Sequence, residues 1–271
     1  SWPQKDRVLP IICVCVGQVI WGFSYLFTRI AQRAASPTVV LSMRFLASWV
    51  IMTALIWSGN KSFSLKGKNF RPLLVLALLE PPYYFFESYG VYYSNATFAG
   101  TVMAFAPVVG ILAAMLFLGE KPSRRQKIFA LLPTAGVIMT AVGSSMGIVK
   151  PLGAIFLFAS QIVAAGMKLY NKKSSEEFSS FERTYAIVVA NAIIFTIKSM
   201  IDLHGDVRAY AAPLGNPEYV FALVILCVFC SIAANLLVNY ACGMMSVTRI
   251  STFSTIATIC SAFGGVIFLG E

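Results

Sequence analysis

The last twenty-five residues of this chain repeat an earlier stretch, and this duplication restricts the possible folds more than any single motif. Shifted back by 151 positions, residues 247–271 align with residues 96–120 without a gap. Both segments end in the same four residues, Phe-Leu-Gly-Glu, at 117–120 and 268–271. The chain is therefore predicted to contain two copies of one structural unit.

Composition places both copies in a membrane. Only 12% of the residues are charged and 58% are hydrophobic, whereas a soluble domain has about 25% charged residues. Apolar runs recur at about the 20 residues that a helix needs to cross a bilayer. The predicted fold is an all-α integral membrane bundle with spans at 8–31, 36–58, 71–93, 97–118, 126–146, 150–171, 181–203, 218–241 and 247–269.

The net charge of +10 reports orientation rather than a nucleic-acid partner. With the N-terminus assigned to the cytoplasm, 14 of the 21 Lys and Arg residues fall on the cytoplasmic side, Lys168 among them, and four on the other side. This bias follows the positive-inside rule. We expect a multi-pass protein of the cell (inner or plasma) membrane with a cytoplasmic N-terminus.

The two Leu-Gly-Glu motifs indicate that the copies have opposite orientations. The first follows the fourth span and the second follows the ninth, so an odd number of spans separates them. We predict two inverted five-helix repeats, at 8–146 (spans one to five) and 150–271 (spans six to nine). The first copy continues into a fifth span, so the complete architecture is expected to have ten spans, nine of them in this sequence.

Chemistry-bearing motifs of enzymes are not found in this sequence. The six cysteines fall in or beside predicted spans, where packing as small apolar residues is the favoured interpretation. His204 is the single histidine, and neither a Ser/His/Asp set nor a phosphate-binding loop is present. We therefore expect no enzyme activity, no metal site and no cofactor.

Taken together, these residues resemble a known family. Two five-helix units with Trp21-Gly22 late in span one, Arg44 in span two, Pro107 in span four and Leu-Gly-Glu after spans four and nine resemble the EamA-type transporters of the drug/metabolite transporter superfamily. The resemblance implies a basket of ten helices around a central cavity, with Trp21 among its residues. It also implies the export of amino acids or related metabolites. Thr258 stands where the first copy has Pro107, so the halves need not be symmetric.

Span three carries the strongest site signal. Glu80 and Glu87 are seven residues apart, which places them on one helix face. A charge at membrane depth costs about 2.5–3.5 kcal/mol, so such carboxylates are functional candidates. Pro81 and Pro82 are predicted to break or bend the helix between them, and Pro107 is a further predicted break.

Two interpretations of Glu87 remain open. Arg44 lies at a similar depth in span two, and the two side chains either form a structural ion pair or Glu87 binds substrate or protons. Tyr83 and Tyr84 share the faces of the two carboxylates, and their rings suit an ammonium group. The remaining predicted cavity residues are Gln18, Gln161, Thr255 and Thr258.

These features predict a secondary active carrier for a small polar metabolite. An amino acid or organic amine is the preferred substrate, moved by proton-coupled export. A channel or facilitator is the alternative, as is a carrier of nucleobases or sugar derivatives. The expected partners are the substrate, protons and lipid, with no nucleic acid; monomer and homodimer both stay open.

The predicted topology can be tested by labelling. Loop 59–70 should be cytoplasmic and loop 204–217 external, with both termini of a ten-span protein inside. Lys66→Cys and Asp206→Cys should therefore react with an impermeant thiol reagent from opposite sides of the membrane. Equal labelling of both positions from outside intact cells would contradict the inverted repeat.

Overall fold

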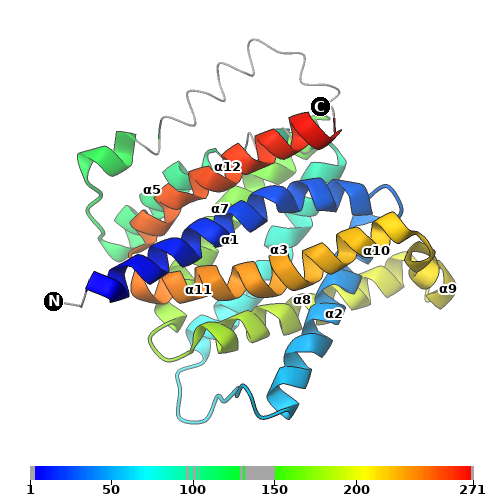
Figure 1. Ribbon diagram of the computed structural model, residues 1–271, viewed down its shortest axis with the longest axis horizontal. Helices are drawn as coiled ribbons and strands as arrows, with labels where there is room; N and C mark the ends of the chain where they lie inside the picture. The colour runs from blue at the N-terminus through cyan, green and yellow to red at the C-terminus, as the bar shows by residue number, and fades with distance from the viewer. Residues whose placement is uncertain are drawn as a thin grey trace.

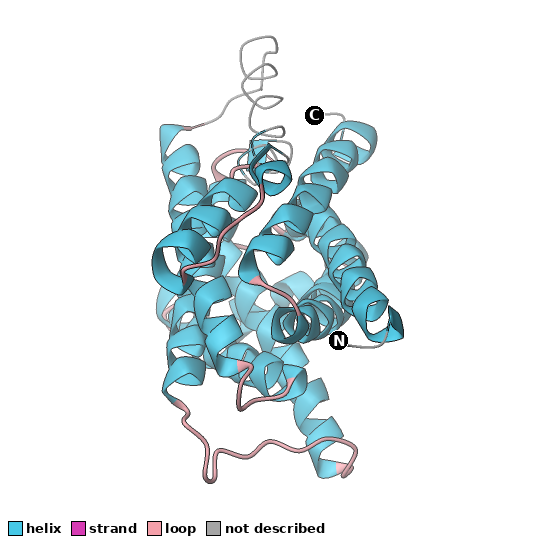
Figure 2. Ribbon diagram, turned by 90° about the vertical axis from the view of Figure 1, so that its left-hand side faces the viewer, coloured by secondary structure: helices cyan, strands magenta, loops and turns pink. Residues whose placement is uncertain are grey.

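A computed structural model describes residues 4–95, 98–99, 102, 104–128, 131 and 150–269, and every regular element in these ranges is helical (Figures 1 and 2). Most of the predicted fifth span, 126–146, lies outside the described residues. The helices are α1 (Gln4–Ala31), α2 (Pro37–Trp57), α3 (Arg71–Tyr92), α5 (Ala106–Leu118), α7 (Pro151–Ser174), α8 (Ser180–Asp202), α9 (Val207–Ala211), η1 (Ala212–Gly215), α10 (Pro217–Val224), η2 (Ile225–Ala233), α11 (Ala234–Met244) and α12 (Val247–Leu269).

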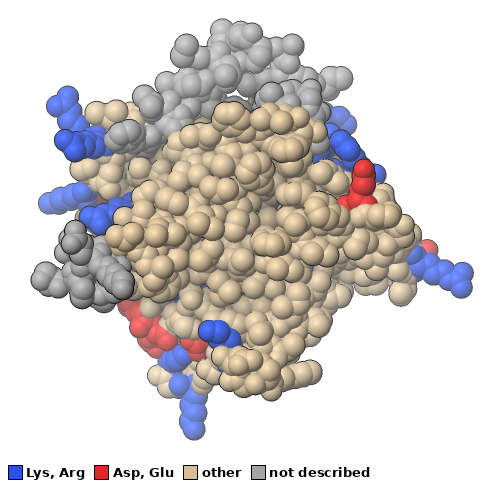
Figure 3. Space-filling model, viewed as in Figure 1, with Lys and Arg blue, Asp and Glu red and all other residues tan. Residues whose placement is uncertain are grey.

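The polarity of the bundle suits lipid. Within the described part of the chain, five helices are long and apolar enough to cross a membrane: Val8–Ala31, Pro37–Trp57, Pro151–Ser174, Ser180–Asp202 and Pro217–Met244. Large apolar side chains such as Ile162 and Leu116 are exposed, while Arg44 and Glu80 are buried. The face in Figure 3 is mostly uncharged, with most charged side chains near its edges. The chain is a multi-pass membrane protein.

The helices pack as an approximate two-fold arrangement of the two repeats. α1 lies against α11 and α12, as Figure 1 shows, whereas α7 lies against α3 and α5. In this relation α1 corresponds to α7, α2 to α8, α3 to α11 and α5 to α12. Exchanging the members of each pair converts the contacts of α1 into those of α7. The pairs α2–α8 and α5–α12 are converted into themselves. This is the relation expected of inverted repeats.

The predicted break in span three does not occur, because α3 is continuous through Pro81 and Pro82. Two prolines remove two backbone donors, but the rest of this 22-residue helix keeps its hydrogen bonds. Its packing on α7 extends over most of its length, since Gly90 lies against Leu157 and Gly166 against Leu79. Contacts with α7 therefore lie on both sides of the two prolines.

Span four is interrupted next to Pro107, since residues 98–99 and 102 are helical and a turn precedes α5. Residues 104–105 form a turn, and α5 starts at Ala106 with Pro107 in its first turn, where a missing N–H is harmless. Gly119 ends α5 in the left-handed conformation (φ 64°). The Glu120 carboxylate then accepts hydrogen bonds from the backbone N–H groups of Val247 (3.0 Å) and Thr248 (2.9 Å). The first Leu-Gly-Glu motif thus ends α5 and caps α12 of the other repeat.

The packing of α1 on α12 predicts a stability effect. A Cβ atom on Gly22 would lie 2.5 Å from Cys260 Cβ and 2.7 Å from the Ala257 carbonyl oxygen. Gly22→Ala should therefore lower stability by about 1–3 kcal/mol. Gly166→Ala is the matched control, because its Cβ would meet Leu79 Cδ1 at an ordinary 3.4 Å. Equal Tm values for the two purified variants at one scan rate would contradict this packing.

Candidate functional site: a cavity between the repeats

A cavity of about 100 Å³ lies between the two repeats. This volume holds several water molecules or a small solute. The first repeat contributes Gln18, Trp21, Ser24, Tyr25, Arg44, Glu80, Tyr83, Tyr84, Glu87 and Ala106. The second repeat contributes Gln161, Ala164, Met167, Lys168, Asn171, Asn235, Val238, Asn239, Cys242, Ile250, Ser254 and Ala257.

The two carboxylates of α3 have different surroundings. Glu87 Oε1 accepts hydrogen bonds from the Tyr83 hydroxyl (2.5 Å) and the Tyr25 hydroxyl (3.0 Å). Glu80 is 3% exposed, and its Oε2 atom has no hydrogen-bond partner among the described residues. A buried polar atom without a partner carries a desolvation penalty. Binding of a proton or a cationic group would therefore reduce the desolvation penalty at Glu80.

Arg44 contacts a serine hydroxyl and two aromatic rings rather than a carboxylate. Its Nε atom donates to Ser231 Oγ (2.5 Å), and its guanidinium lies 5.1 Å from the Phe45 ring and 5.0 Å from the Tyr84 ring. The described residues form two ion pairs within 4.0 Å, and neither includes Arg44 or Glu87. The predicted direct Glu87–Arg44 pair is therefore not formed, although both side chains line the cavity.

A π-helical segment anchors the cavity residues on this side. η2 is a π-helix between α10 and α11, and it supplies Ser231 to Arg44. The carbonyl of Cys230 accepts from the Trp21 indole N–H (3.2 Å). Wider turns displace carbonyls from the regular α-helical ladder and leave them open to such donors. The sequence offered no signal for η2, because its apolar run suits an α-helix equally well.

Lys168 lines the cavity, although the count of basic residues placed it on the cytoplasmic side of the membrane. It is partly buried, and its Nζ atom lies 3.3 Å from Ser254 Oγ and 3.5 Å from Ser251 Oγ. α7 continues to Ser174, so Lys168 lies ~9 Å inside the helix end. The sequence did carry a signal for this depth: the basic pair Lys172-Lys173 marks the membrane interface, one turn beyond Lys168.

An amide network forms one part of the cavity wall. The side chain of Asn171 donates to Asn239 Oδ1 (2.5 Å), and that of Asn239 donates to Thr184 Oγ1 (2.8 Å). The buried Arg183 guanidinium binds the Asn171 side chain and the Asn239 carbonyl (2.6 Å). These bonds join α7, α8 and α11 at the end of the bundle that carries the α2–α3 loop.

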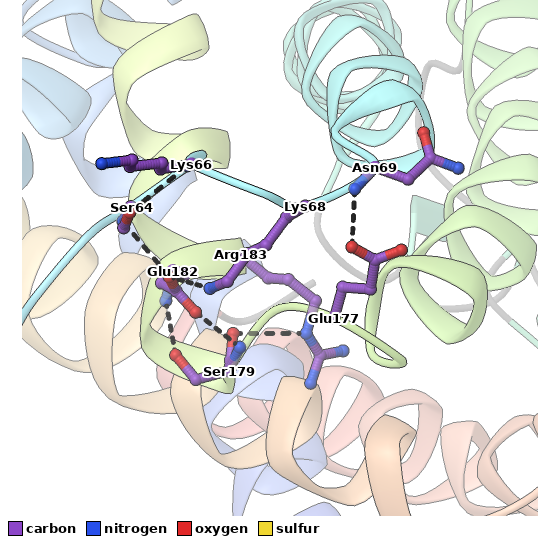
Figure 4. Close-up of polar contacts among 8 residues, drawn as sticks. All are labelled: Ser64, Lys66, Lys68, Asn69, Glu177, Ser179, Glu182 and Arg183. Atoms are coloured by element: carbon purple, nitrogen blue, oxygen red, sulfur yellow. Dashed lines mark hydrogen bonds and ion pairs between the residues drawn. The ribbon is translucent and has the colours of Figure 1, made fainter.

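The α2–α3 loop itself is fastened to the second repeat at this end (Figure 4). Lys68 forms a 2.6 Å ion pair with Glu182, and the Asn69 backbone N–H donates to Glu177 (2.6 Å). Glu182 also completes a capping box with Ser179 at the start of α8. Polar contacts thus connect the two repeats next to the amide network.

On α12, the side chains that line the cavity differ from the two that were predicted. Thr255 and Thr258 do not line it, whereas Ile250, Ser254 and Ala257 do. Neighbouring positions on a helix point ~100° apart, so a shift of one residue changes the face. The other predicted side chains on the cavity wall are Gln18, Trp21, Arg44, Glu80, Tyr83, Tyr84, Glu87 and Gln161. Tyr25 and Lys168 are among the lining residues that the sequence did not single out, and Ser231, which binds Arg44, is a further missed residue.

Charged and aromatic groups enclosed between inverted repeats of membrane helices define a membrane transporter. Comparison with known proteins gives the family. The EamA-like transporter family matches residues 8–142 and 151–271, and the chain belongs to this family.

Named relatives agree with this assignment, and a solved structure shares the fold. The uncharacterized transporter YcxC of Bacillus subtilis is 29% identical over 93% of this chain and 82% of its own length. An uncharacterized transporter of Archaeoglobus fulgidus is 21% identical over 96% of this chain and 90% of its own length. A crystal structure at 16% identity covers 95% of this chain and 87% of its own, with a TM-score of 0.72, which shows a shared fold.

The hydrogen bond from Tyr83 to Glu87 predicts a measurable loss. Hydrogen bonds to charged groups contribute about 1.5–3 kcal/mol, so Tyr83→Phe should lower the stability of the purified protein by that order. Tyr170→Phe is the control, because Tyr170 lies outside the cavity lining. If both variants unfold at the same temperature, Tyr83 does not hold Glu87.

Proposed function

We propose that this protein is a proton-coupled secondary carrier for an amino acid or organic amine, working by alternating access. The observation that carries the proposal is a cavity between the repeats with two carboxylates on α3 and aromatic rings beside them. Carboxylates attract an ammonium group by charge, and aromatic faces add cation–π attraction. Export is the direction that the resemblance to the family implies.

Proton coupling is supported by the different surroundings of the two carboxylates. Glu87 is bound by two tyrosine hydroxyls, whereas Glu80 Oε2 has no partner in the part of the chain that the structure describes. In a site with little water, two neighbouring carboxylates favour the entry of a positive charge, and both a proton and a substrate ammonium meet this need. Exchange of one for the other at these carboxylates would couple their movements.

A carrier is favoured over a channel by the polar contacts that join the two repeats at one end of the bundle. The Asn171–Asn239–Arg183 network and the fastened α2–α3 loop lie at one end of the bundle. A channel needs a continuous aqueous path, whereas a carrier needs a site that opens to one side at a time.

The coupling role of Glu87 can be tested in proteoliposomes. Glu87→Gln should abolish amino-acid or amine uptake driven by a pH gradient, yet preserve exchange of labelled for unlabelled substrate, because the amide cannot carry a proton. Glu218→Gln, at the exposed first turn of α10, is the matched control and should transport like the wild type.

The same assay separates the candidate functions. Saturable uptake with counterflow supports a carrier, whereas ohmic conductance would identify a channel. Normal pH-driven uptake by a well-folded Glu87→Gln protein would refute the coupling role of this residue. Transport of nucleobases or sugar derivatives, and of no amine, would overturn the proposed substrate class.

A further inference from the structure

We infer that Lys168 binds the carboxylate of the substrate opposite Glu80, so that the cavity selects zwitterionic amino acids over simple amines. This inference rests on the proposed function and makes its substrate class narrower. It assigns the ammonium of the substrate to Glu80, because Glu87 already accepts two tyrosine hydrogen bonds.

The first argument is that the charge of Lys168 is not neutralised within the described structure. Its ammonium contacts the hydroxyls of Ser251 and Ser254, and the two ion pairs of the described residues lie elsewhere, at Lys68–Glu182 and Lys198–Asp202. Hydroxyl groups solvate an ammonium but do not balance its charge. A partly buried cation on a cavity wall therefore favours an anionic group in the cavity.

The second argument is the position of Lys168 relative to the carboxylates. α3 and α7 are antiparallel, with Gly90 against Leu157 and Leu79 against Gly166. This register sets Lys168 at the level of residue 78, which is ~3 Å along the axis from Glu80 and ~13 Å from Glu87. Glu80 is thus the carboxylate at the level of Lys168.

The two side chains approach the cavity from different sides. Gly166 faces α3, and two further residues turn the helix by ~200°, so Lys168 points away from α3 and contacts α12. Glu80 reaches the cavity from α3, and within the described ranges its Oε2 atom has no partner. A solute between them meets an unpaired carboxylate oxygen on one side and an unneutralised ammonium on the other, as an α-amino acid requires.

Gly110 of α5 preserves the space around this ammonium. A Cβ atom at Gly110 would lie 3.3 Å from Lys168 Nζ and 2.2 Å from Ser251 Oγ. The absence of a side chain there lets α5 approach α12 while the lysine head group keeps its place beside the two serines. The local packing therefore accommodates a charged group at membrane depth instead of excluding it.

The test compares matched ligands on matched variants. Affinities are measured for alanine, ethylamine and propanoate, and for leucine, 3-methylbutylamine and 4-methylpentanoate, on the purified full chain. The wild type should bind an amino acid roughly tenfold or more tightly than its amine. Lys168→Met should abolish this preference by weakening amino-acid binding without weakening amine binding, while Lys168→Arg restores it. Lys173→Met, an exposed position on the same helix, should behave as the wild type.

The outcomes separate this inference from the proposed function. Amine binding by the wild type without any preference for the amino acid would uphold the proposed function and overturn the role of Lys168. An unchanged preference in Lys168→Met would also overturn that role, as would equal losses for amine and amino acid. Binding of the free acids alone, lost in Lys168→Met, would overturn the proposed function and leave Lys168 as an anion-binding residue.

Discussion

Burial of ionisable side chains between two apolar halves is the constraint on which the structure depends. Lipid surrounds the bundle, so Arg44, Glu80, Glu87 and Lys168 are accommodated only in its interior, where all four meet at one cavity. Glu87 is satisfied by tyrosine hydroxyls, and Arg44 by Ser231 and two rings. Glu80 and Lys168 are satisfied least, and these are the groups to which we assign the substrate.

The backbone adapts to this constraint at specific places. The π-helix η2 turns a carbonyl and a hydroxyl toward Trp21 and Arg44. Gly22 and Gly110 let helices of different repeats approach closely, and Glu120 caps α12 from the end of α5. At the α2–α3 loop end, the two repeats are joined by polar contacts such as the Lys68–Glu182 ion pair.

Much of the fold could be predicted, because spans in a membrane follow from apolar length. The observed bounds of α2, α8 and α12 differ from the predicted spans by a few residues at most. Glu80 and Glu87 were predicted to share a helix face, and the structure places both on the cavity wall. Helical periodicity determines such relations within one helix. It does not determine the rotation of the helix against its neighbours. For this reason Thr255 and Thr258 were predicted to line the cavity, whereas the preceding positions Ser254 and Ala257 line it.

The sequence by itself determined the class of molecule: apolar runs required helices in a membrane, and the repeated Leu-Gly-Glu motif required two copies inserted in opposite senses. The tertiary structure decided which side chains meet. In that structure α3 is continuous through Pro81 and Pro82, and Lys168 lies at the cavity instead of the membrane interface. Arg44 donates to Ser231 and does not pair with Glu87. The physical reason is that hydropathy records how much a segment prefers lipid. The partner of a buried charge depends instead on distances across helices that only their packing sets.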